Sequence, residues 1–297
     1  MAREKKLQFG AINVTMQPHT PQKYIDLFKA VNKLGSAVHI AGDQYGLLAG
    51  VFKVDTGKKY PCPINGDIYR FTNINKNSQW FNTLTNGFAT DNEVDGVVIP
   101  EYLKPNSTRF SYIFYPEQHL VFYESYFDGN CMGPSKATKF FQNLFSQEVI
   151  VKKFGKIEVT HIPDKSELEQ ALSIPIKEKI SFKLTVPNSD SLAKAERLFM
   201  KRMNKMNAET FDASYKAKRG LSIELDEDLT QMAYISAKNG SCSIKGRGHD
   251  ARPVEYTTAK HPFQHTQYYD PDIESAYESF LREATSLKDE VLKWFRK

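Results

Sequence analysis

The sequence contains few cysteines and no long apolar run, and both absences narrow the class of protein. Its 297 residues include three cysteines, Cys62, Cys131 and Cys242, which lie far apart and form no CxxC pair. An odd number of widely spaced cysteines does not suggest a disulfide framework, so we expect reduced thiols. The first residues enter a strand pattern instead of a signal peptide, and no apolar run approaches the roughly 18 residues of a membrane helix. A cytoplasmic protein without membrane insertion is therefore expected.

The sequence also lacks the common motifs of enzymes and of cofactor binding. It contains no GxSxG, no GxxxxGK[ST], no HExxH and no GxGxxG that opens a helix after a strand. His261 and His265 share a four-residue spacing, but Pro262 between them opposes the helix that would bring both onto one metal ion. We therefore predict no catalytic residue, no metal site and no cofactor, and a protein without enzymatic activity is favoured over an enzyme.

One enzymatic alternative stays open, a metal-dependent nuclease. The acidic run ELDED ends in Asp226, Glu227 and Asp228, and His249-Asp250 resembles the metal-binding pair of phosphohydrolases. Side chains of these types hold the divalent ions that activate water for phosphodiester cleavage. The competing interpretations are structural: an acidic start of a helix for the first group, and a polar turn for the second.

The order of the expected elements indicates an α+β fold with two domains. A helix is expected at residues 21–34, with Thr20 as its N-cap and Gly35 at its end, and several short strands with turn residues between them follow. Further along, a short helix is expected to begin at an N-cap Asp164, and a strand is expected at residues 179–187. This pattern predicts a strand-rich, antiparallel α+β domain at residues 1–147. Residues 148–297 are predicted to form a mixed α/β domain that ends in a long helix.

The second predicted domain carries a cluster of basic residues on a helix, a strand and a hairpin. The helix expected at residues 190–208 repeats lysine and arginine every three or four positions along one face. In the hairpin SCSIKGRGHDARP, Gly246 and Gly248 would let the backbone approach a phosphate closely. If these elements are neighbours, eleven cations lie on one side of the domain and can contact DNA phosphates without reading sequence. An ordinary solvated surface is the alternative. The predicted nucleic-acid-binding residues are Lys194, Arg197, Lys201, Arg202, Lys205, Lys216, Lys218, Arg219, Lys245, Arg247 and Arg252.

The C-terminal segment is expected to be a long helix that begins at Pro271-Asp272 and has an apolar seam. Apolar residues recur along it at spacings of four and three over three heptads. Burial against a second copy is the economical explanation, and it predicts a homodimer. Packing into the helix's own domain, or binding to a second protein of the same system, is the alternative. The predicted dimer-interface residues are Ile273, Tyr277, Phe280, Leu287, Val291 and Trp294.

Two stretches of the first predicted domain resemble those of a known protein family. GDIYRFTNI (residues 66–74) and VVIPEYLKPNSTRFSYIF (residues 97–114) are similar to the signature stretches of a family of uncharacterised bacterial and prophage proteins. In that family an IPE-x-L-x-PN segment precedes a hairpin. The resemblance implies a related fold and a prophage context, and it carries no catalytic residue.

In the order of its elements, the chain resembles the RexA-like exclusion proteins of phage lambda. A strand-rich first half precedes a basic second half, the late stretch YISAKNGSCSIKG and a charged terminal helix. RexA-like proteins are similar to the RdgC class, whose dimers bind DNA with little sequence preference. The resemblance implies a double-stranded DNA-binding protein of a phage-exclusion or anti-phage defence system, of the abortive-infection kind. It transfers no individual residue, so the cations named above follow from the charge pattern alone.

Overall fold

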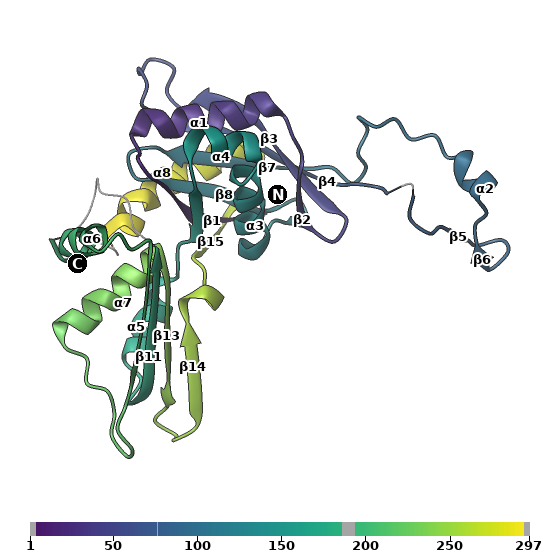
Figure 1. The fold of residues 1–297 in the computed structure, drawn as a ribbon. Helices are drawn as coiled ribbons and strands as arrows, with labels where there is room; N and C mark the ends of the chain where they lie inside the picture. Colours follow the sequence, from purple (N-terminus) through teal and green to yellow (C-terminus); the bar gives the residue numbers. More distant parts are fainter. Residues whose placement is uncertain (1–3, 76, 186–193, 294–297) are drawn as a thin grey trace.

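The computed structural model describes residues 4–75, 77–185 and 194–293. It confirms the α+β class, because the described chain forms two large antiparallel sheets that are covered by helices (Figure 1). Within these described ranges, no helix is both long and apolar enough to cross a membrane.

The larger sheet has nine strands. Its main path is β10-β1-β8-β7-β4-β3-β2, and β15 and β9 pair with β1 and β8 respectively. Strand β1, which lies between β8 on one side and β10 and β15 on the other, is buried on both faces from Phe9 onwards, which explains its nearly continuous apolar sequence. The strands are β1 (Lys5–Met16), β2 (Val38–Ala41), β3 (Gln44–Lys53), β4 (Ile64–Thr72), β7 (Thr108–Tyr115), β8 (Leu120–Phe127), β9 (Asn130–Cys131), β10 (Ile157–His161) and β15 (Gln264–Tyr269).

Three helices cover one face of this sheet. They are α1 (Pro21–Leu34), α3 (Pro134–Phe145) and α4 (Glu148–Phe154). The expected ends of α1 are confirmed: Thr20 Oγ1 accepts a hydrogen bond from the Lys23 backbone N–H at 3.1 Å, and Gly35 ends the helix in the left-handed conformation at φ 60°. Phe28 of α1 stacks on Phe114 of β7 with ring centroids 4.5 Å apart, so this helix is fixed to the sheet through aromatic packing.

The C-terminal helix α8 (Ala276–Lys293) covers the opposite face of the same sheet. Strand β15 pairs antiparallel with β1, so the chain returns to the larger sheet just before the helix. Phe280 and Val291 are fully buried, and the Phe280 ring lies 5.5 Å from that of Phe9 on β1. The domain division expected after residue 147 does not describe this arrangement. Strands β10 and β15 pair with β1 in the first sheet, and α8 packs on that sheet.

The other residues of the expected dimer seam are distributed differently. Tyr277 and Leu287 are partly buried against the same intrachain cluster, and Ile273, ahead of the helix, is 82% exposed. Trp294 lies outside the described residues. The seam therefore packs on this chain's own sheet, because the apolar sheet face opposite α1 needs a cover and β15 brings α8 onto it.

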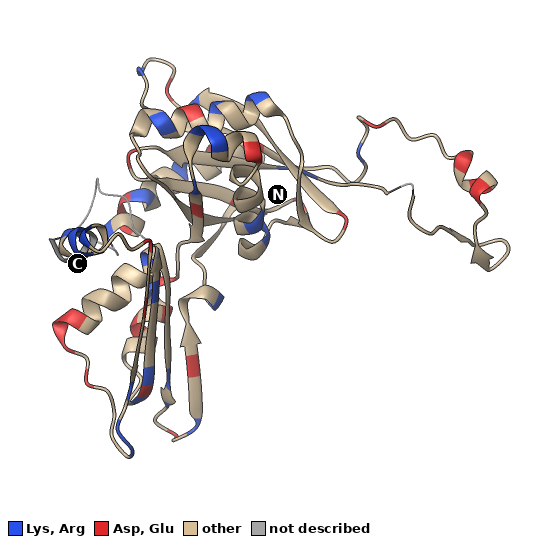
Figure 2. Ribbon diagram, viewed as in Figure 1, with Lys and Arg blue, Asp and Glu red and all other residues tan. Residues whose placement is uncertain are grey.

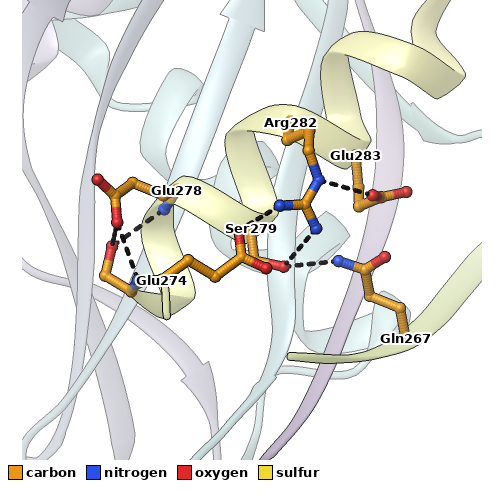
Figure 3. A network of polar contacts seen from close by, with 7 residues as sticks. Gln267, Glu274, Glu278, Ser279, Arg282 and Glu283 are labelled. Carbon is orange, nitrogen blue, oxygen red and sulfur yellow. Dashed lines mark hydrogen bonds and ion pairs between the residues drawn. The ribbon is translucent and has the colours of Figure 1, made fainter. Parts of the chain in front are cut away.

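A capping box determines where α8 begins (Figure 3). Ser275 Oγ accepts from the Glu278 backbone N–H at 3.2 Å, and the Glu278 carboxylate accepts from the Ser275 backbone N–H at 2.9 Å. The Ser275 backbone N–H and hydroxyl both donate to the Glu278 carboxylate and thereby lower the pKa of Glu278. The expected start at Pro271-Asp272 is therefore corrected to Ser275, where reciprocal capping satisfies the free N–H groups.

Polar side chains then tie the first turns of α8 to β15 (Figure 3). The Gln267 side-chain amide lies 2.6 Å from Ser279 Oγ. In the orientation in which the amide oxygen accepts from Ser279, the amide nitrogen donates to both Glu283 carboxylate oxygens at 3.2 Å. Arg282 pairs with Glu283 at 3.2 Å and also with Glu274. The helix is thus held by polar contacts at its exposed edge as well as by its buried seam.

The second sheet has the order β12-β11-β13-β14 and is covered by helices on one face. Its core joins Ile180 and Phe182 of the sheet to Leu168 of α5 and to Ala233 and Ala237 of α7. The expected N-cap Asp164 is confirmed, because its carboxylate accepts from the Ser166 N–H at 2.8 Å. The elements are α5 (Lys165–Leu172), β11 (Ile176–Thr185), α6 (Lys194–Lys205), β12 (Thr210–Lys216), α7 (Glu227–Asn239), β13 (Gly240–Arg247), β14 (Pro253–Thr257) and the 3-10 helix η1 (Thr258–Lys260).

An arm projects from the larger sheet between β4 and β7 (Figure 1). It contains the two-stranded ribbon β5 (Phe81–Asn82) and β6 (Gly87–Phe88) and the short helix α2 (Asp91–Asp95). At its base, the Thr72 N–H donates to the Pro105 carbonyl at 2.9 Å. The expected hairpin follows directly, since β7 and β8 pair around a short loop.

Candidate nucleic-acid interface

The face of the second sheet that lies opposite α5 and α7 is open to solvent. Strand alternation explains its chemistry: along β11, Ile180 and Phe182 point into the core, whereas Lys179, Ser181 and Lys183 point outward. The side chains that β11 presents on this face are therefore polar or cationic. The outward face is hydrophilic because it has no second layer to pack against.

Three lysines form a row across this open face, which we call the lysine row. Lys179 on β11 is directly opposite Lys216 on β12 and directly opposite Lys245 on β13. All three side chains are exposed. Like charges in adjacent cross-strand positions destabilise a sheet, so this arrangement carries a cost for the free protein. A bound anion would remove that cost.

A row of hydroxyl side chains lies two residues along the same strands. Ser181 is paired with Ser214 on one side and with Ser243 on the other, and the Ser181 and Ser214 Oγ atoms lie 3.2 Å apart. Together with Lys183 and Asp212, these residues line a shallow hollow of about 290 Å³. Hydroxyl groups can donate to phosphate oxygens, so both rows present donors on one surface.

Among the described ion pairs, three involve predicted DNA-binding cations. Lys245 contacts Glu255 at 2.9 Å, and Arg247 contacts Glu178 at 2.9 Å. The hydrogen bond from Lys245 lowers the pKa of Glu255. Arg252 pairs with its neighbouring Asp250 at 3.4 Å in the hairpin tip. Because these pairs are exposed, they contribute little stability, and a phosphate can replace the carboxylate.

The predicted cations fall into two groups, because α6 and the hairpin ends that carry the others lie at opposite ends of the second sheet (Figure 2). Helix α6 leads into β12 at Thr210, next to Thr185 at the end of β11. Lys216 lies at the other end of β12, about 20 Å away at 3.3 Å per residue. The first group is Lys194, Arg197, Lys201, Arg202 and Lys205; the second is Lys216, Lys218, Arg219, Lys245, Arg247 and Arg252. The expectation of one shared face is therefore replaced by two separate groups.

Two cations of the open face were missed in the sequence. Lys179 and Lys183 lie in a segment expected as a strand, and the signal was their alternation with Ile180, Phe182 and Leu184. Their importance depends on which strands pair with β11 and in which register, and local sequence does not contain that information.

Gly246 has a structural role that differs from the one expected. A Cβ atom at this position would lie 1.9 Å from the Ile176 carbonyl oxygen, so glycine is needed for β13 to approach β11. The hairpin then turns at residues 248–252, where the Gly248 N–H donates to the Arg252 carbonyl at 3.0 Å. The stretch SCSIKGRGHDARP is thus a strand and an exposed hairpin tip.

A family model described as a domain of unknown function, DUF4747, matches residues 5–285. The match spans both sheets and most of α8, including the open face described above. The chain belongs to the DUF4747 family. A search of curated proteins finds no significant match to the sequence. The DUF4747 description names no activity, so the chemistry must be inferred from the side chains.

Two of the candidate nuclease residues of this DUF4747 protein, Asp226 and Asp250, accept local backbone hydrogen bonds, and His249 lies exposed in the hairpin tip. Asp226 is the N-cap of α7 and accepts from the Leu229 N–H at 2.7 Å, and Glu227 and Asp228 form the acidic first turn. Asp250 accepts from the Arg252 N–H at 3.1 Å in the hairpin tip. Within the described part of the chain, no group of three or more His, Cys, Asp or Glu side chains has an arrangement that could hold a metal ion.

Proposed function

We propose that this protein binds double-stranded DNA through phosphate contacts made by the open face of the second sheet. The observation that carries the proposal is the lysine row, in which Lys216, Lys179 and Lys245 are neighbours on three adjacent strands. A bound polyanion offsets the repulsion between these lysines. Binding is also favoured because each neutralised phosphate releases condensed counterions.

The side chains of the open face support backbone contacts without base readout. Lysines contact phosphates as point charges, and the adjacent Ser181, Ser214 and Ser243 hydroxyls can donate to phosphate oxygens. Such contacts orient a duplex but carry no sequence information. We therefore expect DNA binding with little sequence preference.

The biological setting is the wider part of the proposal. We infer that the protein acts as a cytoplasmic dimer in a phage-exclusion or anti-phage defence system, in which a second protein of that system is a further partner. The RexA-like order of elements in the sequence supports this setting. Expression of the protein should then reduce the plating efficiency of an infecting phage, and charge reversal of the lysine row should restore plating.

Direct binding is tested by fluorescence anisotropy with a labelled random duplex of about 30 base pairs, titrated at several salt concentrations. The variant Lys179→Glu/Lys216→Glu/Lys245→Glu reverses the lysine row, and Lys201→Glu/Arg202→Glu/Lys205→Glu reverses the α6 group. A matched control, Lys58→Glu/Lys59→Glu/Lys139→Glu, makes the same charge change at exposed positions of the first-sheet unit.

We expect the wild type to bind with a steep salt dependence and the row variant to lose affinity. If the row contacts three phosphates, neutral substitution of all three lysines makes the log–log salt dependence less steep, by about 2.7 in the slope. Equal losses in the row variant and in the control would show a general charge effect and refute the site. Absence of wild-type binding at low salt would refute the function.

A further inference from the structure

The arm, defined here as residues 77–103, exposes a large amount of apolar surface. None of its residues is buried, although many are apolar. Its large exposed side chains are Phe81, Leu84, Phe88, Val98, Tyr102 and Leu103, with exposed fractions between 55% and 92%. Phe81 and Phe88 are cross-strand neighbours, and large apolar side chains exposed together mark an interaction site.

The arm is internally ordered in spite of its exposure. The Ala89 N–H donates to the Trp80 carbonyl at 2.8 Å and closes the β5–β6 ribbon. The Glu93 carboxylate accepts from the Thr90 N–H at 2.7 Å and from the Asn82 side chain at 2.5 Å, which ties α2 to the ribbon. A segment that already has its bound shape loses less conformational entropy when it docks.

The charge of the arm indicates the chemistry of its partner. It contains four carboxylates, Asp91, Glu93, Asp95 and Glu101, and no lysine, arginine or histidine, whereas the whole chain has a net charge of +5. Lys104 follows directly at the base of the arm, where it donates to the Asn73 side chain. An acidic arm is repelled by nucleic acid, so its apolar side chains must serve a protein contact. The complementary surface is basic and partly apolar.

Such a surface exists on the body of the same chain. A hollow of about 430 Å³ between α1 and α4 is lined by Lys23, Lys29, Lys33 and Lys153, with Asp26 as the acidic residue among its lining residues. The exposed apolar side chains of these two helices include Leu34, Val149 and Val151. Figure 2 shows acidic residues on α2 and basic residues along α1, far apart within one chain.

We propose that the arm of one copy docks on the α1–α4 hollow of a second copy, and that the reciprocal contact closes a two-fold dimer. The carboxylates of α2 meet the lysines of α1, and the arm's aromatic side chains cover the apolar residues beside the hollow. This inference deepens the dimer of the proposed function by assigning its contact surface, and it replaces the C-terminal seam in that role.

The available surface is sufficient for a stable dimer. If each of the six large side chains of the arm buried about 50 Å², two arms and the surfaces beneath them would bury about 1,200 Å² in total, above the roughly 1,000 Å² of a specific interface. Exchange of arms doubles each contact, so modest pairwise affinities combine into one closed assembly.

The test is sedimentation of the full chain without DNA. The arm variant Phe81→Asp/Phe88→Asp and the hollow variant Lys29→Glu/Lys33→Glu should each raise the dimer dissociation constant about 100-fold or more, as the loss of hot-spot residues does. The control Lys218→Glu/Arg219→Glu makes the same charge change at the end of the second sheet and should leave the dimer intact. All these positions are exposed, so the fold should be unaffected.

A mixing experiment separates this arrangement from other dimers. The hollow variant keeps a normal arm and the arm variant keeps a normal hollow, so their equimolar mixture should form a heterodimer with one docked arm. Failure of the mixture to associate, or a wild type that is monomeric at about 100 μM, would overturn the inference. The sedimentation test contains no DNA, so it tests the dimer separately from the anisotropy assay. A monomeric protein that binds the duplex would leave the DNA proposal intact. A dimeric protein that does not bind the duplex would leave the dimer inference intact and refute DNA binding.

Discussion

Substitution of Lys179 by threonine should raise the stability of the free protein and weaken its DNA binding. Lys179 lies between Lys216 and Lys245 on the open face of the second sheet. At a charge separation of about 8 Å in water, each like-charge contact costs about 0.5 kcal/mol. The nearby Glu255 offsets part of the contact with Lys245. Removal of the central charge should therefore stabilise the sheet by up to about 1 kcal/mol.

The same strand provides a matched control. Lys183 also points outward from β11, but its cross-strand neighbours are Asp212 and Ser241. Lys183→Thr gains the same increase in strand propensity and loses a favourable charge contact instead of a repulsive one. The difference between the two variants isolates the electrostatic contribution of the lysine row.

Thermal unfolding at low salt and at about 1 M salt measures this contribution, because the Debye length falls to about 3 Å at the higher concentration. We expect a melting temperature for Lys179→Thr that is about 2–4 °C higher than for Lys183→Thr at low salt, and a smaller difference at high salt. In the anisotropy assay, the log–log salt slope of Lys179→Thr should decrease by about 0.9. A destabilised Lys179→Thr with unchanged DNA binding would refute the role of the lysine row.

Two further predictions concern the first sheet. Phe280→Ala should destabilise the protein by about 3–5 kcal/mol in thermal or urea unfolding, because Phe280 is fully buried on the sheet; a variant with normal stability and an altered oligomeric state would restore the helix as a dimer contact. Burial raises the pKa of Glu124, so the folded state binds this proton more tightly than the unfolded chain does. Its ionisation therefore disfavours folding above the raised pKa, and the penalty disappears as the pH falls through that pKa toward the ordinary value of 4.5. Melting curves should show that lowering the pH from neutral stabilises the wild type relative to Glu124→Gln, and parallel pH profiles would contradict this.

Local signals in the sequence predicted local structure well. Thr20, Gly35 and Asp164 act at the helix ends where capping chemistry placed them, because a cap depends on residues within one turn. The start of α8 was misplaced because two acidic starts compete there, and the reciprocal capping at Ser275 decides between them.

Long-range features could not be predicted in the same way. The heptad seam of α8 correctly indicated an apolar helix face, but a seam does not specify which surface covers it, and β15 decides that by pairing with β1. The lysine row depends on the register of three strands that are distant in sequence. Charge counting detected the basic region and could not detect that α6 and the lysine row lie at opposite ends of one sheet.

The second sheet is inserted into the first fold through two adjacent connections. The chain leaves the larger sheet after β10 and returns just before β15, and at this point Pro163 and Pro262 form an antiparallel bridge. The Asp164 N–H donates to the His261 carbonyl at 2.8 Å, so the ends of the insertion are hydrogen-bonded neighbours. A two-residue Asn-Gly turn has the length and backbone shape to join such ends.

Replacement of residues 165–260 by Asn-Gly should therefore leave the first sheet folded. The contacts of β10 with the inserted unit include polar ones, such as Thr160 Oγ1 to the Lys238 carbonyl at 3.4 Å and His161 to the Thr258 carbonyl at 3.1 Å, whereas β15 and α8 are retained. We expect cooperative unfolding and an arm-dependent dimer, with complete loss of duplex binding in the anisotropy assay. DNA binding that survives this deletion would assign the contact to the first sheet, and a shortened chain that cannot fold would show that the two sheets depend on each other for stability.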